Sequence, residues 1–211
     1  MTKLFLFGIS FLSLIAGCAT SPDSQRDVLN ATKLCCSGYA DMQVSARLDT
    51  EQVLEINADS PVFSFVGGRS YFSLLLLSEG MRGQSLMLRT FVGSPTITNS
   101  GGAHLYFLPA VTFLNTSREP IVTLNDERPI PELYGWSGTG SFVGKVRIPS
   151  TASFAIIHTS PAKLGQLYTG HVKSPGFTTM TGGVLISQGG GEAPMRAVLS
   201  STGKVLVSIA P

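Results

Sequence analysis

From residue 42 onward, short stretches of alternating polar and apolar residues are separated by breaks rich in glycine, serine and proline. A period of two is typical of β-strands that bury one face, and such breaks are typical of turns. Alternation predicts strands over 43–48, 52–56 and 85–92, and 70–77 and 104–115 are more continuously apolar stretches that also predict strands. Further strands are expected over 60–66, 141–148, 153–159, 183–187, 196–200 and 204–209. Pro109 divides the stretch 104–115, which is therefore expected to be an edge strand, a bulged strand or two short strands.

Two stretches between these strands are patterned weakly. Residues 116–141 carry several charges, prolines and glycines and predict one long irregular excursion with a short strand at 121–124. Residues 160–182 predict no definite element. A series of short strands without a long amphipathic helix predicts an all-β fold, an antiparallel β-sandwich or jelly-roll-like domain over 37–211.

The first seventeen residues have the pattern of a signal peptide. Lys3 supplies a positive charge, and 4–15 is a mostly apolar stretch that is too short to span a membrane comfortably. Between this segment and the strands, 19–27 are small and polar and predict a tether. A short helix is expected over 27–36, because its apolar residues fall on one side of a helix.

The apolar stretch ends in Ile15, Ala16, Gly17 and Cys18, which resembles the lipobox of bacterial lipoproteins. In that interpretation the chain is cut before Cys18, and lipid, palmitate included, is attached to this cysteine. The protein is then anchored to a membrane without spanning it. Ala19 stands where aspartate would resemble an inner-membrane retention signal, which favours the outer membrane with the domain facing the periplasm.

Composition narrows the candidate chemistry. Charged residues make up 13% of the chain and the formal net charge is +2, so no basic surface for nucleic acid is expected. Cys35 and Cys36 are adjacent and could form a vicinal disulfide, pair with another chain or remain buried thiols. The three histidines stand in no ligand spacing to them, so neither a metal site nor a cofactor is expected.

No catalytic set is predicted, and the protein is expected not to be an enzyme. The segment 135–139 (GWSGT) only approaches a nucleophile elbow, because its fifth residue is Thr139 where glycine is expected. A hydrolase is thus the least favoured class. His104 and His158 fall in apolar strands, where histidines with satisfied hydrogen bonds are expected, and His171 falls in a weakly patterned region.

Tyr134 and Trp136 are the candidate ligand-binding residues. Both lie in a stretch rich in glycine and proline, where alternation could present the two rings on one side for stacking on a sugar. Arg128 and Glu132 lie nearby and could bind hydroxyl groups. The alternative is that Trp136 caps the hydrophobic core at a corner of the fold.

Three groups of segments resemble the MalM-like family, which is named for a periplasmic protein of the maltose operon. They are 60–65 (SPVFSF) with Gly68, 70–72 (SYF) and 74–77 (LLLL); then 107–115 (FLPAVTFLN); then 142–149 (FVGKVRIP) with 156–159 (IIHT). The resemblance covers about 35–165. It implies an extracytoplasmic, β-rich accessory protein associated with maltodextrin uptake, and it carries no catalytic residues.

These expectations combine into one functional hypothesis with one main alternative. The main hypothesis is that the chain is a non-enzymatic accessory or binding lipoprotein linked to carbohydrate (maltodextrin) transport. Its partners would be an oligosaccharide or envelope transport proteins. The alternative is a structural or assembly lipoprotein of the envelope that acts through protein–protein contacts at a sheet edge or near Cys35 and Cys36.

Overall fold

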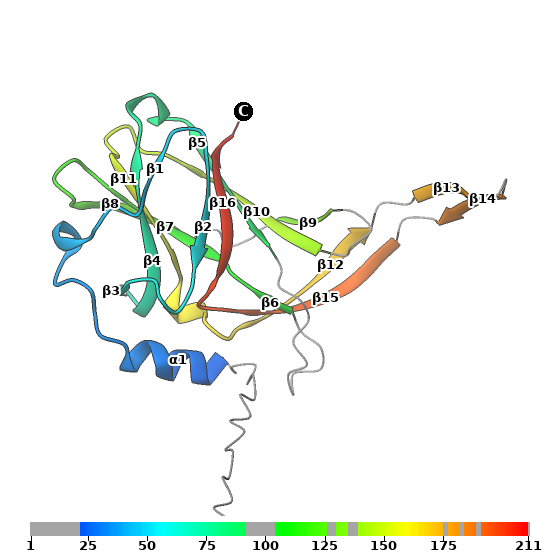
Figure 1. Ribbon diagram of the computed structural model, residues 1–211, viewed down its shortest axis with the longest axis horizontal. Helices are drawn as coiled ribbons and strands as arrows, with labels where there is room; N and C mark the ends of the chain where they lie inside the picture. The colour runs from blue at the N-terminus through cyan, green and yellow to red at the C-terminus, as the bar shows by residue number, and fades with distance from the viewer. Residues whose placement is uncertain are drawn as a thin grey trace, which may run out of the picture.

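The computed structural model describes residues 22–91, 104–125, 130–134, 139–174, 177–181, 184–188 and 191–210 (Figure 1). Its helices are α1 (Pro22–Ala31) and the 3₁₀ turns η1 (Tyr39–Asp41), η2 (Glu79–Met81) and η3 (Pro161–Lys163). The strands are β1 (Ala46–Leu48), β2 (Glu51–Ile56), β3 (Val62–Phe65), β4 (Gly68–Leu77), β5 (Ser85–Phe91), β6 (His104–Tyr106), β7 (Pro109–Leu114), β8 (Pro120–Asn125), β9 (Ile130–Tyr134), β10 (Thr139–Arg147), β11 (Phe154–Thr159), β12 (Leu167–Ser174), β13 (Phe177–Thr181), β14 (Val184–Gln188), β15 (Gly191–Leu199) and β16 (Gly203–Ile209). The all-β, sandwich-like fold expected from the alternation is confirmed.

Two sheets form the body. One has the order β1-β4-β11-β7-β8, with β3 paired to the first half of β4, and the other has the order β2-β16-β5-β10-β9. All neighbouring pairs in these sheets are antiparallel except β1 and β4, which run parallel. A smaller sheet, β12-β15-β6, leads away from the body to the paired strands β13 and β14 (Figure 1).

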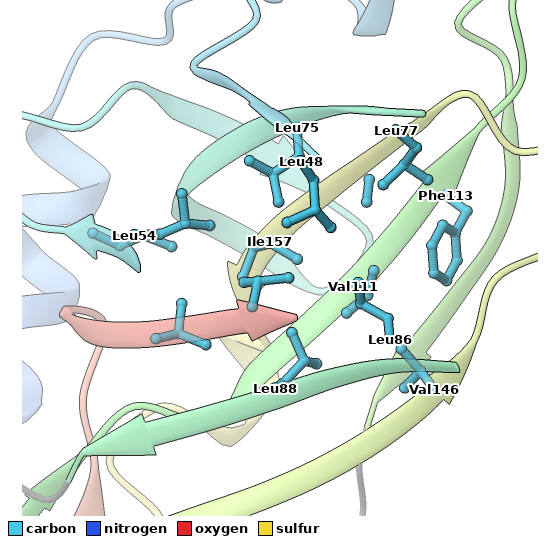
Figure 2. Close-up of a cluster of buried hydrophobic side chains, with 14 of the residues drawn as sticks. Leu48, Leu54, Leu75, Leu77, Leu86, Leu88, Val111, Phe113, Val146 and Ile157 are labelled. Atoms are coloured by element: carbon cyan, nitrogen blue, oxygen red, sulfur yellow. The ribbon is translucent and has the colours of Figure 1, made fainter. Parts of the chain in front are cut away.

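The main core lies between the two large sheets. Leu75 of β4, Val111 of β7 and Ile157 of β11 face Leu86 and Leu88 of β5, and all five are almost completely buried (Figure 2). Burying one such side chain contributes about 1.5–3 kcal/mol. Of these five residues, Leu86 and Leu88 come from the stretch 85–92, where alternation predicted a strand with one buried face.

The outer face of the first sheet is also apolar. Phe72 and Leu74 of β4 point away from the main core and join a second buried cluster with Phe63, Phe65 and Ile156. This explains why β4 is apolar at almost every position instead of alternating: a strand covered on both faces has no side exposed to solvent.

Residues 35–42 cover part of this outer face. Met42 belongs to the second cluster, and Tyr39 packs against it. Arg118, in the turn between β7 and β8, donates hydrogen bonds to the carbonyl oxygens of Ala40 and Met42. Its guanidinium also lies over the Phe154 ring, 5.1 Å from the centroid. These contacts hold the covering segment in place.

Helix α1 closes one end of the sandwich. Leu29 enters the main core, and the Oε1 atom of Gln25 accepts hydrogen bonds from Ser201 N at 3.0 Å and Ser201 Oγ at 3.1 Å. Arg69 of β4 donates to the carbonyl oxygen of Thr32, just beyond the helix, at 3.0 Å. The helix expected over 27–36 thus lies five residues earlier, at Pro22–Ala31, and 32–36 are not helical. Pro22 suits the first turn of a helix, so 22–27 are part of the helix instead of the tether.

Three other expectations need correction or resolution. The short strand expected at 121–124 is confirmed as β8, but the expectation of one long irregular excursion over 116–141 is wrong, because β9 and the start of β10 also lie within it. Strands β8 and β9 are at sheet edges, where charged and proline residues are tolerated. The region 160–182 contains β12 and β13, which pair with β15 and β14. Of the three alternatives for 104–115, the structure has two short strands, and Pro109 is the first residue of the second.

Candidate functional site

A hollow of about 440 Å³ lies beside Cys35 and Cys36. We call it the disulfide hollow. Its described lining consists of Cys35, Cys36, Asp41, Gln43, Val44, Ser45, Asp59, Pro61 and Phe72. Volumes of this order are typical of small-molecule sites.

The hollow forms where two strands leave the same edge of β4. Strand β3 pairs with β4 up to Tyr71, and β1 begins to pair at Leu75. Between them, Phe72 N donates to the carbonyl oxygen of Pro61 at 3.1 Å, and Ser45 N donates to the carbonyl oxygen of Leu74 at 2.8 Å. The two chains diverge from there, and buried Phe72 lies at the base of the opening.

A vicinal disulfide forms one wall. The Sγ atoms of Cys35 and Cys36 are bonded to each other. Cys35 N donates to the carbonyl oxygen of Val62 at 2.9 Å, and Cys36 packs against the second cluster. The backbone bond and this packing fix the position of the disulfide relative to β3.

The polar part of the lining consists mainly of hydrogen-bond acceptors. The Asp41 carboxylate accepts hydrogen bonds from Ser37 Oγ, Ser37 N and Gly38 N, and the bond from Ser37 Oγ is the largest cause of a lowered pKa of Asp41. Asp59 and Gln43 are exposed at the rim. The described lining contains two carboxylates and neither lysine nor arginine, so an anionic ligand would be repelled.

A second hollow of about 260 Å³ lies over the other half of the same sheet face. We call it the histidine hollow. It is lined by Tyr39, Phe65, Val66, Thr112, Thr123, His158, Ser160 and Pro161. Tyr39 belongs to the segment 35–42, so that segment contributes to both hollows.

His158 is at the centre of a hydrogen-bonded row in the histidine hollow. Nδ1 lies 2.9 Å from the carbonyl oxygen of Thr159, which can only accept, so Nδ1 carries the proton and donates. Nε2 therefore accepts from Thr112 Oγ1 at 3.0 Å, and Thr112 Oγ1 in turn accepts from Thr123 Oγ1 at 2.9 Å. Burial lowers the pKa of His158 to about 4, partly opposed by the bond to Thr159.

This row gives His158 a structural role. Both ring nitrogens are engaged, the ring is almost fully buried, and it stacks on Phe65. The prediction that His158 is a sheet histidine with satisfied hydrogen bonds is confirmed. The side chains of His104 and His171 lie outside the described residues.

Most residues predicted to bind a ligand cannot be placed. Cys18, Arg128 and Trp136 lie outside the described residues, as does most of the segment 135–139. Glu132 and Tyr134 belong to β9, where only their backbone is described; they pair with Ser141 and Thr139 of β10. Two residues apart on one strand, they fall on the same face of the sheet.

Sequence reasoning missed the disulfide hollow. Its polar residues, Gln43, Asp41 and Asp59, come from turns and strand approaches that carry no motif. Among the described residues, no group of three or more histidine, cysteine and acidic side chains could hold a metal ion. Within the same part of the chain, no helix is both long and apolar enough to cross a membrane.

The chain matches no model of a known protein family, and it matches no curated protein sequence. The MalM-like resemblance of the segments between 35 and 165 thus stays a prediction, as do lipid attachment and export.

Proposed function

We propose that this chain is an exported lipoprotein, anchored by lipid on Cys18 and facing the periplasm from the outer membrane. It acts as a non-enzymatic, MalM-like accessory protein that binds a carbohydrate during maltodextrin transport. The disulfide hollow is the observation that carries this proposal, because it has the volume of a small-molecule site and its described lining combines apolar side chains with hydrogen-bond acceptors.

The oxidised cysteine pair supports export. Disulfides persist in oxidising compartments such as the periplasm and are rare in the cytosol. Cys35 and Cys36 are bonded in the first segment after α1, close in sequence to the proposed anchor. This agrees with a domain that folds after it has left the cytoplasm.

The lining of the hollow supports a neutral, hydroxyl-rich ligand. The disulfide and the exposed Pro61 offer an apolar wall for the C–H face of a sugar ring. The carboxylates of Asp41 and Asp59 offer acceptors for its hydroxyl groups, and hydrogen bonds to charged acceptors are the stronger ones. An uncharged sugar therefore suits both the apolar part and the acceptor part of the lining.

Isothermal titration of the mature, lipidated protein in detergent with maltodextrins tests this proposal. We expect saturable binding, weakened at least about tenfold by Asp59→Ala, because this substitution removes a charged acceptor. The matched control is Asp27→Ala, which removes an exposed carboxylate on α1. Lack of binding to any glycan, or equal weakening by both substitutions, would contradict the proposal.

One observation favours assembly as a second candidate. Strand β2 is at the edge of its sheet and, among the described strands, its backbone pairs with β16 alone; Val53 on it is 56% exposed. An open edge can accept a strand from another protein. Chemical cross-linking in intact cells that consistently joins β2 to one partner, with no glycan binding, would favour this candidate.

A further inference from the structure

The end of the sandwich that carries α1 combines a short connection to Cys18 with exposed apolar side chains. Only three residues separate Cys18 from Pro22, the first residue of α1. Four backbone steps span at most roughly 14 Å. A lipid on Cys18 would thus hold the beginning of α1 within that distance of the bilayer.

Helix α1 cannot move away from the body without breaking several contacts. Gln25 accepts hydrogen bonds from the turn between β15 and β16, and Arg26 Nη2 donates to the carbonyl oxygen of Leu164 at 2.9 Å. Leu29 is buried in the main core. The short connection therefore restrains the whole sandwich and not only the helix.

Three exposed apolar residues lie on the elements of this same end. Val28 on α1 is 49% exposed, and Leu167, which follows η3, is 46% exposed. Val66 is 99% exposed in the turn between β3 and β4, and the next residue, Gly67, lies close to Ala162 of η3. Three of the seven large hydrophobic residues that are exposed in the described chain thus lie around α1 and η3.

The charges of this end are mixed. Lys163 of η3 and the half-exposed Arg26 provide positive charge, and the exposed Asp23 and Asp27 provide negative charge; Arg26 and Asp23 form an ion pair at 3.9 Å. Apolar side chains with neighbouring long cations suit the boundary between acyl chains and headgroups, where the cations reach the water. With charges of both signs, a zwitterionic bilayer suffices.

We propose that the α1 end of the sandwich, with Val28, Val66 and Leu167, rests directly on the phospholipid bilayer. This inference depends on the proposed lipid anchor at Cys18. It fixes the orientation of the protein: the C-terminus, at the end of the sandwich away from α1, points away from the membrane (Figure 1). The disulfide hollow then belongs to a domain that is held close to the bilayer surface.

Quenching by lipid-borne nitroxide tests this orientation. The lipidated protein is placed on phosphatidylcholine vesicles with a fluorescent probe attached at Val66→Cys or, as the control, at Glu79→Cys in η2. We expect several times stronger quenching at position 66, because η2 follows the far end of β4, a strand that spans about 33 Å at roughly 3.3 Å per residue. Leu167→Ser should reduce the quenching at 66, and Val53→Ser should not.

Three results would overturn the inference in distinguishable ways. Equal quenching at 66 and 79 in protein whose Cys18 carries lipid would contradict the orientation alone. A mass spectrum without lipid on Cys18 would contradict the proposed anchor together with the orientation. A partner protein bound at the α1 end would leave the probe at 66 unquenched and would also contradict it.

Discussion

The imidazole of His158 lies flat on the ring of Phe65, with their centroids 3.9 Å apart and their planes parallel. The stack belongs to the apolar outer face of the first sheet, and the neutral histidine tolerates this environment because both of its nitrogens are hydrogen-bonded. A positive charge in this position would lose hydration and the bond from Thr112, since protonated Nε2 cannot accept.

This burial predicts a pH-dependent stability. The pKa of His158 is about 4 in the folded protein, below the value of about 6.5 expected when unfolded, so the unfolded chain binds the extra proton first. The contribution of neutral His158 to the free energy of unfolding is complete above about pH 6.5. It is lost as the pH falls to about 4, a loss of about 3 kcal/mol. Urea unfolding of wild type and His158→Phe from pH 7 to 4 measures this loss. The variant should show the flatter dependence; equal slopes would contradict the assignment.

A side chain at position 203 is expected to clash with the main core. A Cβ atom at this position would lie 2.4 Å from the Cβ atom of Phe107, which is buried in the main core. Gly203→Ala should therefore destabilise by about 1–3 kcal/mol, as overpacked cores do. The control is Gly80→Ala, where nothing lies within 4 Å. Thermal unfolding compares them, and similar melting temperatures would argue against this close contact.

Gln25 should determine whether α1 stays on the body. Gln25→Ala leaves the buried Ser201 N–H without this acceptor, at a cost of about 1–3 kcal/mol. Hydrogen exchange should accelerate in α1 with little change in β4 and β11. Asn30→Ala, at an exposed position of the same helix, is the control. Unchanged exchange in α1 of the Gln25 variant would show that other contacts hold the helix.

Removal of the disulfide should affect binding more than stability. A bond between adjacent residues closes a very short loop and constrains the unfolded chain little. The double variant Cys35→Ala/Cys36→Ala should thus lose less than about 1 kcal/mol of unfolding free energy, while maltodextrin binding weakens as the wall is lost. Denaturant unfolding and calorimetry give the two values. A large loss of stability with intact binding would assign the pair a structural role.

The sequence predicted the fold better than the site. Alternation located strands such as β5 and β16, because each buries one face against the main core. It failed for β9, where Pro131 indicated a loop, and an edge strand accommodates proline. Pro22 is a usable signal for the start of α1, but the helix was predicted from the apolar residues of 27–36 alone.

The disulfide hollow could not be predicted because it depends on register. It exists because β1 joins β4 in parallel at Leu75, four residues after the last pair with β3. That pairing brings together Gln43 and Asp59, which no local pattern connects. Nonlocal pairing of this kind follows from the packing of the whole chain.

Both proposals depend on one modification, lipid on Cys18. The most direct test is the mass of the mature protein extracted from membranes, with its N-terminal peptide. The account predicts a chain that begins at Cys18 and carries acyl chains, and a Cys18→Ser variant that is not processed in this way. A mature chain that begins elsewhere, or one whose Cys18 has no lipid, would contradict it.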